Sequence, residues 1–182
     1  MSLKEQDIYK AFNPYCNSGV NVRVASAVIS VPKAIIERIR REAERQGVNL
    51  EEYVIELLSR DLDPEDKARE YIEASLELLS QARGEAAKGN VRQAAEKTWG
   101  AVALAVKAYA YRKEGRSLRS HRDLWEYKDK VADELGEWVG RAFREASGLH
   151  TCFYEGWCTE RDIREVIVEV EKLIRKIEEA IG

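Results

Sequence analysis

The chain has 182 residues, of which 45% are hydrophobic and 35% charged, a composition that excludes a disordered protein and suits one sizeable core. Its 30 basic and 33 acidic residues leave a net charge of −3, which excludes a protein that coats nucleic acid through an overall basic field. No apolar run approaches the roughly 18 residues that span a bilayer, and the odd number of cysteines, three, is typical of a reduced interior. We therefore predict a cytoplasmic protein that does not enter a membrane.

The first third of the chain is predicted to form a small appendage. Residues 1–24 show no steady period and are expected to be an irregular arm, whereas the β-branched run at 24–31 predicts a short strand. Two helices should follow, separated by Gly47, with Asn49 as the N-cap of the second. The second helix is expected to carry an apolar stripe, formed by Tyr53, Val54, Leu57 and Leu58.

Two long helices are predicted next. Asp63 and Pro64 combine an N-cap with proline at the first helical position, so a helix should run from there to about Ala87. After a tight turn, apolar residues recur at 3.6-residue spacing until Gly115. Long helices joined by a short turn must pack antiparallel.

The remaining residues predict further helices. Ser120 can cap one of them, and its apolar stripe continues through Gly148 to Trp157, so we expect the helix to continue there. Thr159 can cap the last helix. The tryptophans lie on or next to apolar stripes and are expected in the core: Trp99, Trp125, Trp138 and Trp157.

Three segments of these helices carry a family resemblance: AAEKTWGA at 94–101, HRDL at 121–124 and LHTCFYEGW at 149–157. Through them and the order of the long helices, residues 64–182 resemble the HEPN superfamily (higher eukaryotes and prokaryotes nucleotide-binding), and within it an archaeal repeat-associated group labelled PaREP. The resemblance implies a mainly all-α protein, with a HEPN-like antiparallel up-down bundle at 63–182.

The strand-helix-helix appendage, residues 25–62, resembles a ribbon-helix-helix unit through ISVP at 29–32 and the two helices that follow. In that family the strands of two chains pair, and outward side chains of the ribbon read DNA. Here Ser26, Val28 and Ser30 stand where long donors would read the major groove, so dimerisation is favoured over DNA binding. One short strand cannot form a sheet alone, which predicts a homodimer or a higher homo-oligomer.

Each of the two histidines follows an arginine at the spacing of the HEPN ribonuclease motif. By that resemblance, Arg144, His150 and Tyr154 form the preferred catalytic set, and Arg116 with His121 is the alternative. Histidine transfers protons near neutral pH, and an arginine stabilises negative charge on phosphorus. Six residues along one helix separate two side chains by about 240° and about 9 Å, so Arg144 and His150 would converge only across a dimer. Otherwise His150 belongs to the helix interface and Arg144 to the solvated face.

Two kinds of function stay open. The first is a HEPN-like protein that binds or cleaves RNA as a metal-independent endoribonuclease, or binds nucleotides, in a toxin–antitoxin or defence system. The second is a non-catalytic dimer, either a DNA-binding or protein-interaction module or a structural homo-oligomer. No cofactor or metal is predicted, because no glycine-rich phosphate loop is present and Cys152 and Cys158 are not spaced as in a zinc knuckle. These cysteines are expected to be free thiols.

Overall fold

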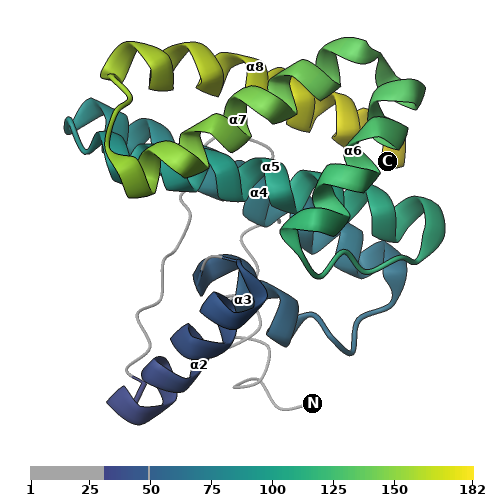
Figure 1. Ribbon diagram of the computed structural model, residues 1–182. Coiled ribbons are helices and arrows are strands. Elements are labelled where there is room, and N and C mark those ends of the chain that lie inside the picture. The colour runs from purple at the N-terminus through teal and green to yellow at the C-terminus, as the bar shows by residue number, and fades with distance from the viewer. Residues whose placement is uncertain (1–30, 49) are drawn as a thin grey trace, which may run out of the picture. The chain divides into compact units, whose positions relative to one another are not determined.

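A computed structural model describes residues 31–48 and 50–182, and its described part is all-α (Figure 1). Residues Pro32–Gly182 form one compact unit. The predicted arm, the predicted strand up to residue 30 and the Asn49 cap lie outside the described residues. The helices are α2 (Lys33–Gln46), α3 (Leu50–Leu58), α4 (Pro64–Ala87), α5 (Val91–Glu114), α6 (His121–Leu135), α7 (Glu137–Glu155) and α8 (Glu160–Ile181).

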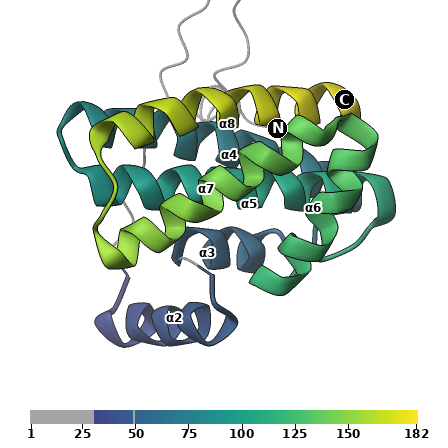
Figure 2. The same ribbon diagram turned by 45° about the horizontal axis from the view of Figure 1, so that its top comes forward.

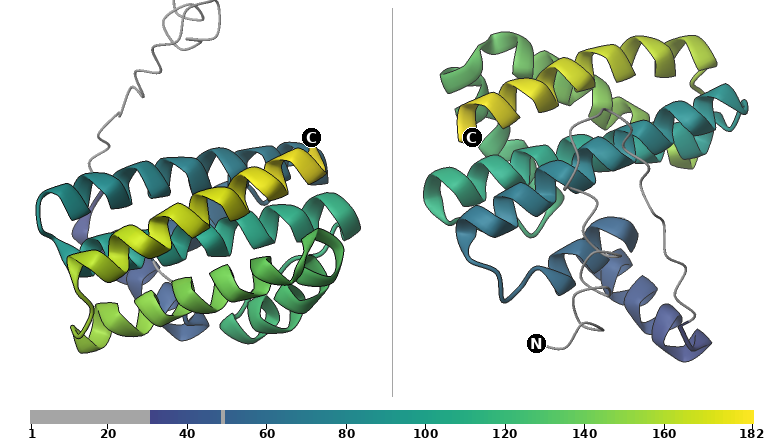
Figure 3. Two further views of the ribbon diagram at one scale, coloured as in Figure 1. Left: turned by 90° about the horizontal axis from the view of Figure 1, so that it is seen from above. Right: turned by 180° about the vertical axis from the view of Figure 1, so that it is seen from behind.

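The predicted pair of long helices is confirmed as α4 and α5, which lie side by side (Figure 3). The Asp63 carboxylate caps α4 by accepting hydrogen bonds from the backbone N–H groups of Glu65 and Asp66, at 2.9 and 3.0 Å. At the C-terminus of α5, Gly115 adopts a φ of 60°, a left-handed conformation that glycine reaches without strain, and ends the helix.

Helix α5 is enclosed by its neighbours. Helices α7 and α8 cover one face of the α4–α5 pair, and α3 lies on the opposite side (Figure 2). A helix buried on every side needs small residues where its neighbours approach closely, and α5 supplies a run of alanines. The fully buried ones are Ala94, Ala95, Ala101, Ala103, Ala105, Ala108 and Ala110.

The C-terminal helices differ from the prediction at one glycine. The apolar stripe after Ser120 predicts one helix, but Gly136 has a φ of 114° and ψ of 145°, and it separates α6 from α7. The predicted continuation through Gly148 is confirmed, because α7 runs through it. The predicted capping residues are also confirmed: Ser120 and Thr159 each take part in a capping box.

Helix α3 leaves part of its apolar stripe on the surface. Leu57 and Leu58 are exposed, Leu58 by 77%, whereas Glu52 and Ser59 are fully buried. The Glu52 carboxylate forms an ion pair with Lys107 on α5, at 2.7 Å. Helix α3 therefore packs inward through a charged residue as well as through Ile55.

The tryptophans divide between core and surface. Trp99 is buried in the core, and Trp138 packs against it, as predicted. Trp125 and Trp157 are 39% and 56% exposed, so the prediction of a core position is wrong for both. No helix in the described residues is long and apolar enough to cross a membrane.

The prediction of free thiols is wrong for Cys152 and Cys158, which form a disulfide. After α7 ends, Gly156 takes a φ of 74° and turns the chain back. The turn places the two Cα atoms 5.7 Å apart, within the range that a disulfide requires. The bond therefore closes the connection between α7 and α8.

Candidate active site

The two histidines lie together although they belong to different helices. His121 is the first residue of α6 and His150 lies near the end of α7, and their ring centroids are 4.8 Å apart. The buried indole of Trp99, on α5, lies against both rings, at 5.0 Å from His121 and 5.6 Å from His150. The fold thus joins residues that the sequence offers as alternatives.

A carboxylate holds one of the two rings. The Nδ1 atom of His150 lies 2.9 Å from Oε2 of Glu96, and both side chains are largely buried. An ionised carboxylate can only accept a hydrogen bond, so Nδ1 carries the hydrogen, and Nε2 is the ring nitrogen that Glu96 does not bind. Glu96 and Trp99 are three residues apart on α5 and therefore share one helix face. This arrangement sets the position of the His150 ring and the nitrogen that faces Glu96.

His121 favours the neutral imidazole. Burial is the largest cause that lowers its pKa below 6.5, and the charge of His150 adds to it, while two carboxylates only oppose the shift. The Nε2 atom is buried and has no hydrogen-bond partner among the described residues. A buried polar nitrogen without a partner is costly, and a catalytic role is one explanation of such an atom.

Tyr154 lies where the cluster meets solvent. The residue is 64% exposed, and its ring packs edge-on against His150, with centroids 5.2 Å apart. Partial burial, then the charges of Glu96 and Glu44, raise the pKa of Tyr154, so its hydroxyl stays protonated at neutral pH and can donate a hydrogen bond. We call His121, His150, Trp99, Glu96 and Tyr154 the histidine cluster.

Neither Arg116 nor Arg144 forms a hydrogen bond, ion pair or ring contact with His121 or His150 of its own chain. The exposed Arg144 side chain turns back along α7, so that a methyl group at Gly140 would lie 3.5 Å from its Nη1 atom. The guanidinium of Arg116 lies 5.5 Å from the ring centroid of Tyr127. Of the preferred set, His150 and Tyr154 are in contact, and His121 joins them from the alternative set.

The sequence did not indicate Glu96 or Trp99 as parts of a site. Their i, i+3 spacing on an alanine-rich helix places them on one face, but that spacing is common. Only the packing of α5 against α6 and α7 shows which face meets the histidines. Within 31–48 and 50–182, no group of three or more His, Cys, Asp or Glu is placed to hold a metal ion.

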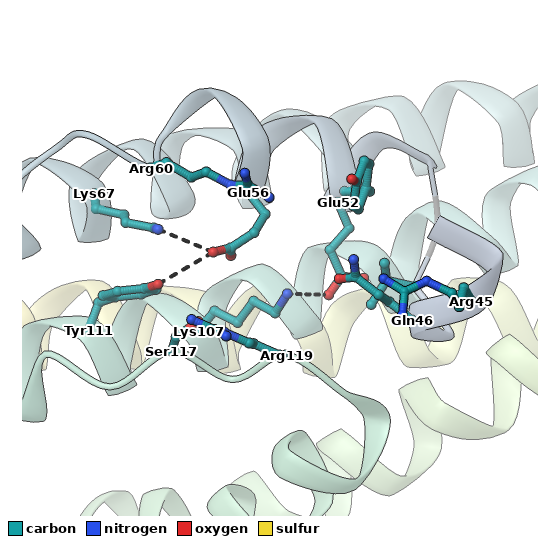
Figure 4. Close-up of a pocket in the computed structure, with 12 residues that line it drawn as sticks. Arg45, Gln46, Glu52, Glu56, Arg60, Lys67, Lys107, Tyr111, Ser117 and Arg119 are labelled. Carbon is teal, nitrogen blue, oxygen red and sulfur yellow. Dashed lines mark hydrogen bonds and ion pairs between the residues drawn. The ribbon is translucent and has the colours of Figure 1, made fainter. Parts of the chain in front are cut away.

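A pocket of about 730 Å³ is lined by α2, α3, α4, α5 and the segment before α6 (Figure 4). Its two carboxylates are both engaged. Glu52 pairs with Lys107 at 2.7 Å, and Glu56 pairs with Lys67 at 3.2 Å. The lining residues are Arg45, Gln46, Val48, Glu52, Tyr53, Glu56, Arg60, Lys67, Lys107, Tyr111, Ser117 and Arg119.

The Glu56 carboxylate is held in its charged form. Burial by itself would raise the pKa of Glu56, but a hydrogen bond from the Tyr71 hydroxyl and the charges of Lys107 and Lys67 outweigh it and lower the pKa. The Tyr111 hydroxyl, 3.4 Å away, also donates to Glu56. The pocket wall is therefore a network of paired charges between α3 and the long helices.

In the described residues, the fold and the cluster define an all-α helical bundle with a carboxylate-supported histidine pair. Residues 70–174, more than half of the chain, match the model of the archaeal PaREP1/PaREP8 family, so the protein belongs to that family. The matched residues include the whole histidine cluster. Comparisons with curated proteins and with solved structures find no match. The predicted PaREP relationship is confirmed, whereas the HEPN and ribbon-helix-helix resemblances stay predictions.

Proposed function

We propose that this protein is a HEPN-like endoribonuclease that cleaves RNA by attack of a ribose 2′-OH. The observation that carries the proposal is the pair of histidine rings with centroids 4.8 Å apart, one favouring the neutral form and one held by a carboxylate. The reaction needs a base and an acid that act at neutral pH, which two differently placed imidazoles supply.

His121 is the base and His150 the acid in this proposal. His121 takes the 2′-OH proton while the oxygen forms a bond to phosphorus, and His150 gives a proton to the 5′-oxygen as its bond to phosphorus breaks. The products are a 2′,3′-cyclic phosphate and a 5′-OH. Glu96 holds the His150 ring through Nδ1, and the Tyr154 hydroxyl can donate to a phosphoryl oxygen.

A cation is also expected at the phosphorus. Arg144 is exposed and turns away from His150 of its own chain, so its predicted role requires a second copy. The exposed apolar residues of the α2–α3 segment, Ile35, Leu57 and Leu58, support a homodimer. The same exposed residues favour the second candidate, a dimeric protein-interaction or DNA-binding module without catalysis. A toxin–antitoxin or defence role would fit either candidate.

The test is cleavage of end-labelled single-stranded and structured RNA by the purified protein. His121→Ala and His150→Ala should each reduce the rate by about 100-fold or more, because each removes a proton-transfer group. Glu96→Gln should also slow cleavage, whereas Glu145→Gln, at an exposed position on α7, should not.

The pH dependence separates the two roles. A base must be neutral and an acid protonated, so the rate should pass through a maximum. His121→Ala should remove the rise on the acidic side, and His150→Ala the fall on the basic side. No cleavage by the unaltered protein, or equal cleavage by the histidine variants, would overturn the proposal.

A further inference from the structure

The pocket of about 730 Å³ carries more positive than negative charge. Five cationic residues line it against two carboxylates. Lys107 and Lys67 are neutralised by Glu52 and Glu56, as the dashed contacts in Figure 4 show. The cationic residues are Arg45, Arg60, Lys67, Lys107 and Arg119.

Two of the three arginines that line the pocket, Arg60 and Arg119, can pair with an anion. The third, Arg45, already pairs with Glu42 at 2.9 Å, and Glu42 lies outside the pocket lining. Arg60 and Arg119 make no ion pair with the residues that the structure describes, and both are exposed to solvent. The Ser117 hydroxyl oxygen is buried beside them and has no hydrogen-bond partner in the described ranges. The pocket thus offers two guanidinium groups and one hydroxyl to an anion.

The pocket adjoins the histidine cluster. Arg119 lies two residues before His121, in the segment that leads into α6. Burial is the main cause of the lowered pKa of His121, but Glu52 and Lys107 of the pocket wall also act on it electrostatically. An anion held in this pocket would therefore lie near the ring that we assign as the base.

We propose that this pocket binds a phosphate group of single-stranded RNA, next to the bond that the histidine cluster cleaves; this inference rests on the proposed function. Guanidinium groups bind phosphate oxygens through paired hydrogen bonds. The volume lies within the roughly 300–1,000 Å³ of small-ligand sites, so a nucleotide unit fits. The Tyr53 ring in the lining gives a base a surface for stacking.

The test measures binding apart from cleavage. A fluorescent hexaribonucleotide with 2′-O-methyl groups cannot be cleaved through its 2′-oxygens, and its anisotropy reports binding to the full-length protein. Arg60→Gln and Arg119→Gln should each weaken binding about tenfold, the effect of losing one charged hydrogen-bonding partner. Each should also lower the slope of log affinity against log salt by about 0.7. Arg141→Gln removes the same charge from an exposed position on α7 and should change neither quantity.

A second arm identifies the source of the phosphate. Adenosine 5′-monophosphate is added in competition; if it displaces the oligonucleotide at micromolar concentration, the pocket serves free nucleotides, which overturns the assignment to an RNA strand. If Arg60→Gln, Arg119→Gln and Arg141→Gln all bind the oligonucleotide equally, the proposal that this pocket binds its phosphate is wrong. Failure of cleavage together with arginine-dependent binding would reject only the proposed function.

Discussion

The buried ion pair between Lys107 on α5 and Glu52 on α3 provides a sharp test of how the α2–α3 segment is held. The Lys107 side chain is 3% exposed and the Glu52 side chain 0%. Lys107→Met keeps the length of the side chain and removes its charge, so a buried carboxylate loses its ammonium group. Breaking a buried pair from one side costs about 3–5 kcal/mol.

This cost is measurable by thermal unfolding followed by circular dichroism. For a domain of this size, 1 kcal/mol shifts Tm by roughly 2–4 °C, so Lys107→Met should lower Tm by roughly 6–20 °C. Lys172→Met is the matched control, because Lys172 pairs with Glu169 at an exposed position and such pairs contribute at most about 1 kcal/mol. The double change Lys107→Met with Glu52→Leu should recover most of the loss, because an apolar pair avoids the desolvation of both charges.

Two results would refute the reasoning. If Lys107→Met lowers Tm no more than Lys172→Met, the pair does not stabilise the contact between α3 and α5. If the double variant is as unstable as Lys107→Met or less stable, the loss does not come from leaving a carboxylate in a buried site.

Three further predictions concern other parts of the molecule. Because its pKa is lowered on folding, His121 stays neutral in the folded chain while the unfolded chain binds a proton below about pH 6.5, so the free energy of unfolding should fall between about pH 7 and about pH 5.5. Denaturant titrations at several pH values should show that the free energy of unfolding depends less on pH in His121→Phe. The same pH dependence as in the unaltered protein would contradict the lowered pKa of His121. A thiol titration of unfolded, unreduced protein should lack the two thiols of Cys152 and Cys158, and reduction should cost about 2 kcal/mol of stability for so short a loop; three reactive thiols would exclude the disulfide. Leu58→Glu should halve the mass measured by light scattering if α3 lies in a homodimer interface, and a mass of one chain for the unaltered protein would reject the dimer.

Local signals account for the elements that the sequence predicted correctly. Asp63, Pro64 and Gly115 act on the backbone next to them, so the bounds of α4 and α5 follow without knowledge of the fold. Local signals do not predict the break at Gly136, because glycine within an apolar stripe can either end a helix, as Gly136 does, or continue it, as Gly148 does. Whether the helix ends at Gly136 depends on how α6 and α7 pack.

The candidate site was harder to predict because its parts come from three helices. The Arg–His spacing indicates His121 and His150 as separate candidates, and helix geometry predicts that Arg144 points away from His150. Nothing in the spacing brings the two histidines together, since that depends on Trp99 packing against both rings. The inward face of α3 is likewise not given by local sequence, because burial of Glu52 depends on a lysine far along the chain.

The enclosure of α5 has a consequence for any ligand that reaches both regions. Trp99 of the histidine cluster and Lys107 of the pocket wall lie on this helix, eight residues apart, which corresponds to about 12 Å along its axis. A helix packed on all sides cannot stretch or bend without opening the core. The separation between the proposed cleavage point and the proposed phosphate contact is therefore constant, so RNA strands too short to cover it should lose the benefit of the pocket.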